Sequence, residues 1–79
     1  MFAVGKAVFF LPPEALVGKD VVIRLFSLKA GPMLVSTVSM RIPSRTLVKF
    51  PAGDLAKGNY ALEVDGPLEK YRGTFRINH

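Results

Sequence analysis

The side chains that could carry out chemistry are few in this 79-residue sequence. There is no cysteine, and His79 is the single histidine. A cysteine nucleophile and a thiolate metal site are therefore excluded. A zinc site built on histidines and a Ser-His-Asp triad are also excluded, because each needs an internal histidine.

The carboxylates of the second half of the chain do not form a pair suited to general acid-base work. Each lies beside an expected turn or at an outward strand position: Asp54, Glu63, Asp65 and Glu69. Turn chemistry accounts for Asp54 and Asp65. The glycines are spread singly through turns, so no phosphate-binding loop is present. We predict a protein that is not an enzyme, with no catalytic, metal or cofactor site.

Positive charge is the first indication of a partner. Eleven Lys and Arg against six Asp and Glu give a net charge of +5. This balance favours attraction to nucleic acid, anionic glycans or acidic membrane surfaces, and it also keeps a small domain soluble. The candidate binding residues fall into two groups. They are Lys70, Arg72 and Arg76 on one face of the last expected strand, and Arg41, Arg45 and Lys49 in a run without an acidic residue.

Alternation of apolar and polar residues predicts the elements that carry these groups. It is clearest after the turn at Asp54, where Tyr60, Leu62 and Val64 share one face. Strands are expected at residues 2–11, 21–28, 33–42, 45–50, 59–65 and 70–77, with one helical turn at residues 13–18. The pattern predicts one all-β domain over residues 1–79, a small Ig-like Greek-key β-sandwich of six to seven strands. No stretch is long enough to span a membrane as a helix.

Two strands have unusual patterns. Residues 21–28 are apolar on nearly both faces, which favours a central position in a sheet. In residues 33–42, Leu34, Val38, Met40 and Ile42 are expected to face inward, but Ser36 interrupts this set. A bulge or an edge position would accommodate it.

The motif Leu55-x-x-Gly58-x-Tyr60 resembles the tyrosine corner of Greek-key sandwiches such as fibronectin type III domains. The Tyr60 ring would pack inward, and its hydroxyl would bond a backbone group near Asp54 or Leu55. Gly58 would allow a positive φ in the entry turn. This motif indicates a fold rather than a function.

A longer resemblance covers Val21 to Ile77. The run Val22-x-x-Leu25-Phe26-Ser27-Leu28, the corner motif with Leu62 and Val64, and the basic last strand are similar to the C-terminal sorting domains of the type IX secretion system. Those domains are small Ig-like sandwiches at the ends of exported Bacteroidetes proteins. The resemblance implies recognition of Tyr60 to Val64 and Lys70 to Ile77 by the secretion machinery. It also implies a secreted or cell-surface location.

Three partner hypotheses follow. The first is a protein-interaction module that binds through strand addition or surface charge. The alternative is a small basic β-barrel that binds single-stranded nucleic acid. Against it, the aromatic residues that would stack on bases are expected inside, namely Phe26, Phe50, Tyr60, Tyr71 and Phe75, and only Phe2, Phe9 and Phe10 are undecided. The third is a homodimer through the uncharged edge of Ala7 to Leu11.

Overall fold

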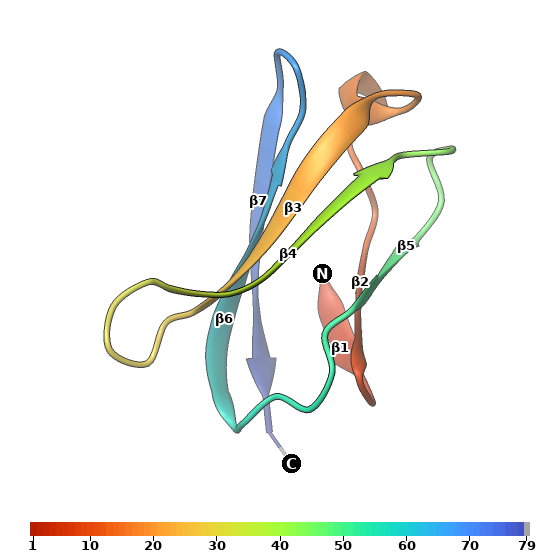
Figure 1. Ribbon diagram of the computed structural model, residues 1–79. Coiled ribbons are helices and arrows are strands. Elements are labelled where there is room, and N and C mark those ends of the chain that lie inside the picture. Colours follow the sequence, from red (N-terminus) through yellow and green to blue (C-terminus); the bar gives the residue numbers. More distant parts are fainter. Residues whose placement is uncertain (79) are drawn as a thin grey trace.

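The computed structural model describes residues 1–78, which fold into two antiparallel sheets packed face to face (Figure 1). The three-stranded sheet has the order β1-β2-β5, and the four-stranded sheet has the order β4-β3-β6-β7. The strands are β1 (Phe2–Val4), β2 (Ala7–Phe10), β3 (Asp20–Ser27), β4 (Met33–Arg41), β5 (Val48–Pro51), β6 (Gly58–Asp65) and β7 (Lys70–Ile77). The predicted helical turn is a short 3-10 helix, η1 (Glu14–Leu16). The chain is a small all-β sandwich, as its alternation predicts.

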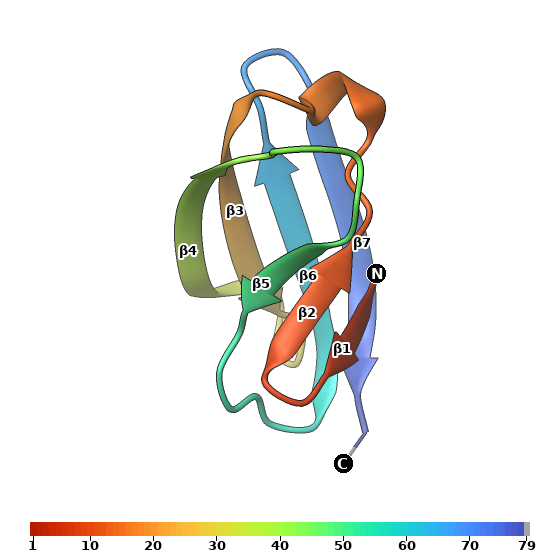
Figure 2. The ribbon, with the colours of Figure 1, turned by 90° about the vertical axis from the view of Figure 1, so that its right-hand side faces the viewer.

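The first expected strand is in fact a hairpin. Gly5 has a φ of +59° while Lys6 has a negative φ, which is the signature of a type II′ turn, and β1 folds back onto β2. β5 pairs with the other side of β2 (Figure 2). The hypothesis of a homodimer through the edge of Ala7 to Leu11 is therefore wrong, because β2 has a strand on both sides. The apolar residues on either side of the pair Gly5-Lys6 concealed the turn.

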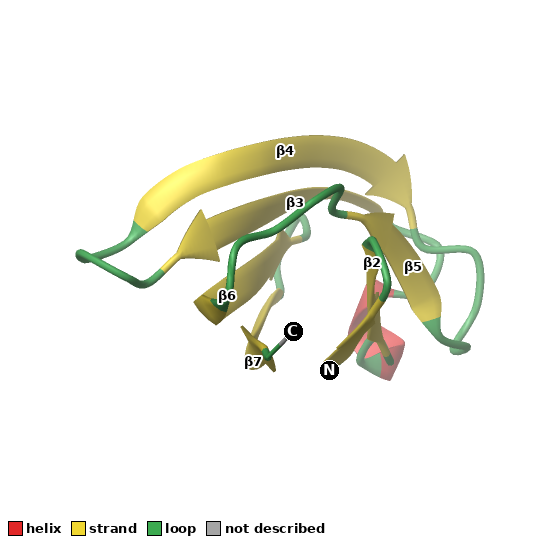
Figure 3. Cartoon of the chain, turned by 90° about the horizontal axis from the view of Figure 1, so that it is seen from below, coloured by secondary structure: helices red, strands yellow, loops and turns green. Residues whose placement is uncertain are grey.

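The core lies between the two sheets, which Figure 3 shows end on. β3 occupies a central position, as predicted, and its residues Val21, Ile23 and Leu25 are buried. Facing them from the three-stranded sheet are Val8, Phe10, Val48 and Phe50. Leu16 of η1 is also fully buried in this cluster. Among the described residues no charged side chain is buried, so apolar packing holds the sheets together.

A bulge near the start of β4 changes which residues face the core. Leu25 pairs with Ser36, but Phe26 pairs with Leu34, so Val35 is the extra residue. One inserted residue reverses the facing of everything before it. Leu34 therefore lies opposite Phe26 on the outer face and is 53% exposed, and its predicted inward position is wrong. β4 is also an edge strand, so both explanations offered for Ser36 hold.

The corner before β6 has the predicted geometry. The Tyr60 hydroxyl donates a 2.6 Å hydrogen bond to the backbone oxygen of Ala56, one residue beyond the expected acceptors. The Tyr60 ring stacks on Phe75 with centroids 5.6 Å apart. Gly58 has a φ of +151°, which confirms the expected positive value. The corner therefore joins the loop to the β6–β7 pair.

Candidate functional site

The outer face of the four-stranded sheet carries most of the predicted binding residues. Lys70, Arg72 and Arg76 occupy exposed outward positions of β7, as the alternation predicts. Their outward direction is fixed by the neighbouring residues of β7, which point into the core: Phe75 and Ile77 are buried and Tyr71 is half-buried. The basic row is thus carried by a strand that is anchored in the core.

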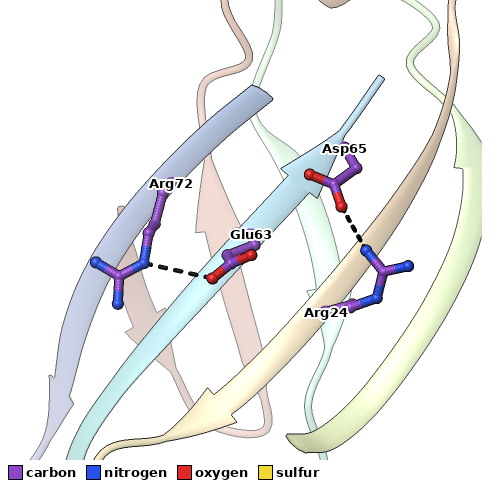
Figure 4. Close-up of polar contacts among 4 residues, drawn as sticks. All are labelled: Arg24, Glu63, Asp65 and Arg72. Carbon is purple, nitrogen blue, oxygen red and sulfur yellow. Dashed lines mark hydrogen bonds and ion pairs between the residues drawn. The ribbon is translucent and has the colours of Figure 1, made fainter. Parts of the chain in front are cut away.

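Cross-strand ion pairs partly neutralise this face (Figure 4). Arg72 Nε lies 3.5 Å from Glu63 Oε2, its register partner on β6. Asp65 is the register partner of Lys70, but its carboxylate accepts a hydrogen bond from Arg24 of β3 instead. Within residues 1–78, Lys70 and Arg76 have no carboxylate at ion-pair distance, so they are the unneutralised charges of β7.

Arg41 lies at the opposite edge of the same sheet. Its guanidinium donates two hydrogen bonds to Asp20, from Nε at 3.1 Å and from Nη2 at 3.3 Å. Hydrogen bonding and attraction to Arg41 lower the pKa of the Asp20 carboxyl, and the same pair raises the pKa of Arg41. Both groups are exposed, so this pair holds β3 and β4 in register only weakly.

The six predicted basic residues do not form one patch. β4 and β7 are the two outer strands of their sheet, so Arg41 is far across it from Arg72 and Arg76. Arg45 lies in the exposed connection between β4 and β5, and Lys49 lies on the outer face of the other sheet. Strand order therefore keeps Arg72 and Arg76 apart from the run of Arg41, Arg45 and Lys49.

An apolar area on the outer face of the four-stranded sheet, where β3 ends and β4 begins, was not predicted. Phe26 follows the buried Leu25 in β3, so it faces outward rather than into the core, and its register partners there are Leu34 and Ala61. Leu34 and Val35 are 53% and 46% exposed. Ala61, expected outside, is fully buried because it lies between Phe26 and Thr74 in the register. The sequence held two indications: Ser36, whose misfit marked the bulge, and the alternation of residues 21–28, which puts Phe26 on the face opposite Leu25.

The outer face of the three-stranded sheet holds the one exposed pair of stacked rings among the described residues. Phe2 and Phe9 lie with ring centroids 5.4 Å apart, and Phe2 is 45% exposed. Lys49 is the register partner of Phe9. Phe10 is buried, as are Phe50, Tyr60 and Phe75. Of the three undecided aromatics, two therefore face outward beside a lysine.

Residues 1–78 contain no group of three His, Asp or Glu side chains placed to hold a metal ion. In the same part of the chain, no helix is long and apolar enough to cross a membrane. Comparison of the chain with protein-family models, curated proteins and solved structures finds no match. The site must therefore be interpreted from its own geometry.

Proposed function

We propose that this chain is a non-enzymatic interaction module that binds a protein partner through its last two strands, β6 and β7. The observation that carries this proposal is the basic row of β7. Lys70, Arg72 and Arg76 all face solvent, and the residues between them anchor the strand in the core. A fixed row of cations suits recognition of an acidic surface, because charge complementarity sets register and speeds encounter.

The proposal includes an Ig-like Greek-key classification. The chain passes between the two sheets three times, after β2, β4 and β5, as in Greek-key sandwiches rather than in simple meanders. The corner bond from Tyr60 to Ala56 stands at the start of β6, where tyrosine corners occur in such folds. These two features support the resemblance to fibronectin type III domains.

The partner is proposed to be a component of a secretion machinery, and the protein is proposed to be secreted or held at the cell surface. This rests on the resemblance to type IX sorting domains. Two observations agree with it: β6 and β7 pair along their whole lengths, and Lys70 and Arg76 remain free of ion pairs within the described residues. Because β6 and β7 are already paired, a partner can bind them without the entropy cost of ordering a flexible segment.

A reporter fusion tests this function. The 79 residues are fused to the C-terminus of a soluble reporter enzyme in a Bacteroidetes host that has the type IX system. Reporter activity is then measured in the medium and in the cells. We expect export of the fusion, and retention of both the unfused reporter and a Lys70→Glu/Arg76→Glu fusion. Retention of the wild-type fusion would refute the sorting function.

The matched control is Lys29→Glu/Lys57→Glu. These two lysines are exposed and lie in loops outside β6 and β7, and the substitutions change the net charge by the same amount. We expect normal export of this control. Equal retention of the two double variants would show that net charge, and not the β7 row, is recognised. Circular dichroism of each purified domain checks that it is folded.

A second candidate function is single-strand nucleic-acid binding on the other sheet. One observation favours it: the exposed stack of Phe2 and Phe9 lies beside Lys49. Such proteins combine aromatic rings on which bases stack with nearby cations that contact the backbone. The burial of Phe10, Phe50, Tyr60 and Phe75 limits the platform to this pair, so we rank this function second.

A further inference from the structure

The four edge strands of the sandwich differ in how they are protected from pairing with another chain. β1 has three residues and lies against β7, and the side chain of Met1 lies over Gly73 of β7. β5 has four residues and ends at Pro51. β7 carries its basic row. Shortness, proline, charge and coverage are the usual protections of sheet edges.

β4 has almost none of these protections. It is the longest strand, with nine residues, and it contains no proline and no lysine. Arg41, its last residue, is its one charge. Among the described residues no strand pairs with its outer edge, and Figure 2 shows it at the open side of the sheet. The backbone groups along this edge are therefore free to pair with an added strand.

We propose that β4 pairs antiparallel with β4 of a second copy of this chain. The bulge at Val35 leaves residues 36–41 as the regular part of the strand. A two-fold axis at Val38 sets Val38 against its own copy and Thr37 against the copy's Ser39. Hydroxyl pairs of this kind are favourable across antiparallel strands. The two four-stranded sheets become one sheet of eight strands.

In this register two copies of β4 can pair without bringing like charges together. In this register each Arg41 lies opposite Val35 of the other copy, so the two guanidinium groups are at opposite ends of the interface. Each Arg41 keeps its bond to Asp20. The long stem of Arg41 can cover the exposed Val35 while its charged end stays in water. No like charges meet.

Two other arrangements of a second copy are less suitable. Pairing of β4 with β7 of the next copy would use an edge that β1 and the basic row protect, and as a head-to-tail contact it would not close as a two-fold dimer does. Packing of two three-stranded sheets by their outer faces offers little area. Strands of three or four residues, with a rise of about 3.3 Å per residue, give a face far below the roughly 800 Å² per partner of a standard interface. Face packing also lacks the backbone hydrogen bonds that pairing of β4 with β4 would add.

Sedimentation equilibrium of the purified chain tests the proposal. Between about 10 µM and 1 mM, a concentration range suited to a small interface, the mass should rise from 8.7 kDa towards twice that value. Thr37→Lys/Ser39→Lys places lysines opposite each other across the axis, so it should remain monomeric. Asn59→Lys/Thr74→Lys adds the same charges at exposed outer-face positions of β6 and β7, and it should associate as the wild type does.

Hydrogen exchange on the wild type locates the contact without any substitution. Within residues 36–40, the backbone amides that point away from β3 should exchange more slowly at high concentration than at low concentration, and those of β5 and β7 should not change. A monomer throughout the concentration range would overturn the proposal. Equal loss of association in both lysine variants, or concentration-dependent protection outside β4, would overturn it as well. Lys70→Glu/Arg76→Glu should still dimerise, which separates this proposal from the proposed function.

Discussion

Removal of the Tyr60 hydroxyl is the most direct test of the corner that starts β6. In Tyr60→Phe the ring keeps its burial, with 5% exposure, and its stack on Phe75. The change removes only the 2.6 Å hydrogen bond to the Ala56 oxygen. One such bond contributes about 0.5–1.5 kcal/mol to the free energy of unfolding.

The exposure of Ala56 decides where in this range the loss should fall. Ala56 is exposed, so water can reach its carbonyl oxygen once the hydroxyl is gone. The larger penalty for a buried, unsatisfied acceptor, about 1–3 kcal/mol, therefore does not apply. We expect a loss of about 1 kcal/mol, which corresponds to a fall in the melting temperature of about 4–8 °C for a domain of this size.

Denaturation in urea, followed by circular dichroism, measures this loss as a lower midpoint with an unchanged slope. Tyr71→Phe is the matched control. The Tyr71 ring stacks on Phe10 with centroids 5.9 Å apart, and within residues 1–78 its hydroxyl makes no hydrogen bond. We expect the control to change stability by less than about 0.5 kcal/mol. A Tyr60→Phe midpoint equal to that of the wild type, or a loss that Tyr71→Phe matches, would refute the corner interpretation.

Three further predictions concern the entry turn, one ion pair and the aromatic pair. Gly58→Ala should lower the free energy of unfolding by about 1 kcal/mol or more, because Gly58 has a φ of +151°. An added Cβ would meet no atom within 4 Å, so the loss comes from the backbone alone. An unchanged midpoint in urea would contradict this. NMR titration should place the pKa of Asp20 below its ordinary value of 3.8, and Arg41→Gln should restore it. Because this pKa is lowered, any stability from the pair is present above the unfolded-state pKa and is lost as the pH falls through the folded-state value; no effect of Arg41→Gln on this pKa would contradict the assignment. If the second candidate function is correct, a single-stranded oligonucleotide should bind with a steep salt dependence that Phe2→Ala/Phe9→Ala weakens, whereas no binding at low salt would exclude it.

The alternation of the sequence was sufficient to predict the strands that have one buried and one exposed face. β7 spans the predicted residues, and its inward and outward sets are as expected. The corner motif was also readable, since Gly58 and Tyr60 act within a few residues of each other. These features depend on local spacing, which a sequence shows directly.

Features that depend on pairing with a distant strand were missed. The facing of Leu34 is set by the bulge at Val35, opposite β3, and alternation along β4 alone gives the wrong side. The hairpin of β1 and β2 was missed for a different reason. Gly5 and Lys6 were the only local signs of a turn between two apolar runs, and a type II′ turn needs only a glycine at its first central position.

The ion-pair partners of the charged side chains were also not predictable from the sequence. Four of the eleven basic side chains make ion pairs within residues 1–78, and three of these pairs join neighbouring strands of the four-stranded sheet. Nothing in the sequence indicated that Asp65 would bind Arg24 rather than Lys70, its register partner. That choice leaves Lys70 free, and a free Lys70 is what the proposed β7 recognition requires.

Strand order decides whether the lack of charge on β4 has a consequence. The sequence shows that residues 33–40 contain no charged side chain and that residues 70–77 contain three. If β4 were an inner strand, its neutrality would be ordinary, because inner strands need no protection from pairing. The order β4-β3-β6-β7 makes both strands edges, so the charges of β7 act as protection and their absence from β4 leaves an edge open. An edge whose first eight residues carry no charge is where association should begin, and Thr37→Lys/Ser39→Lys should prevent it.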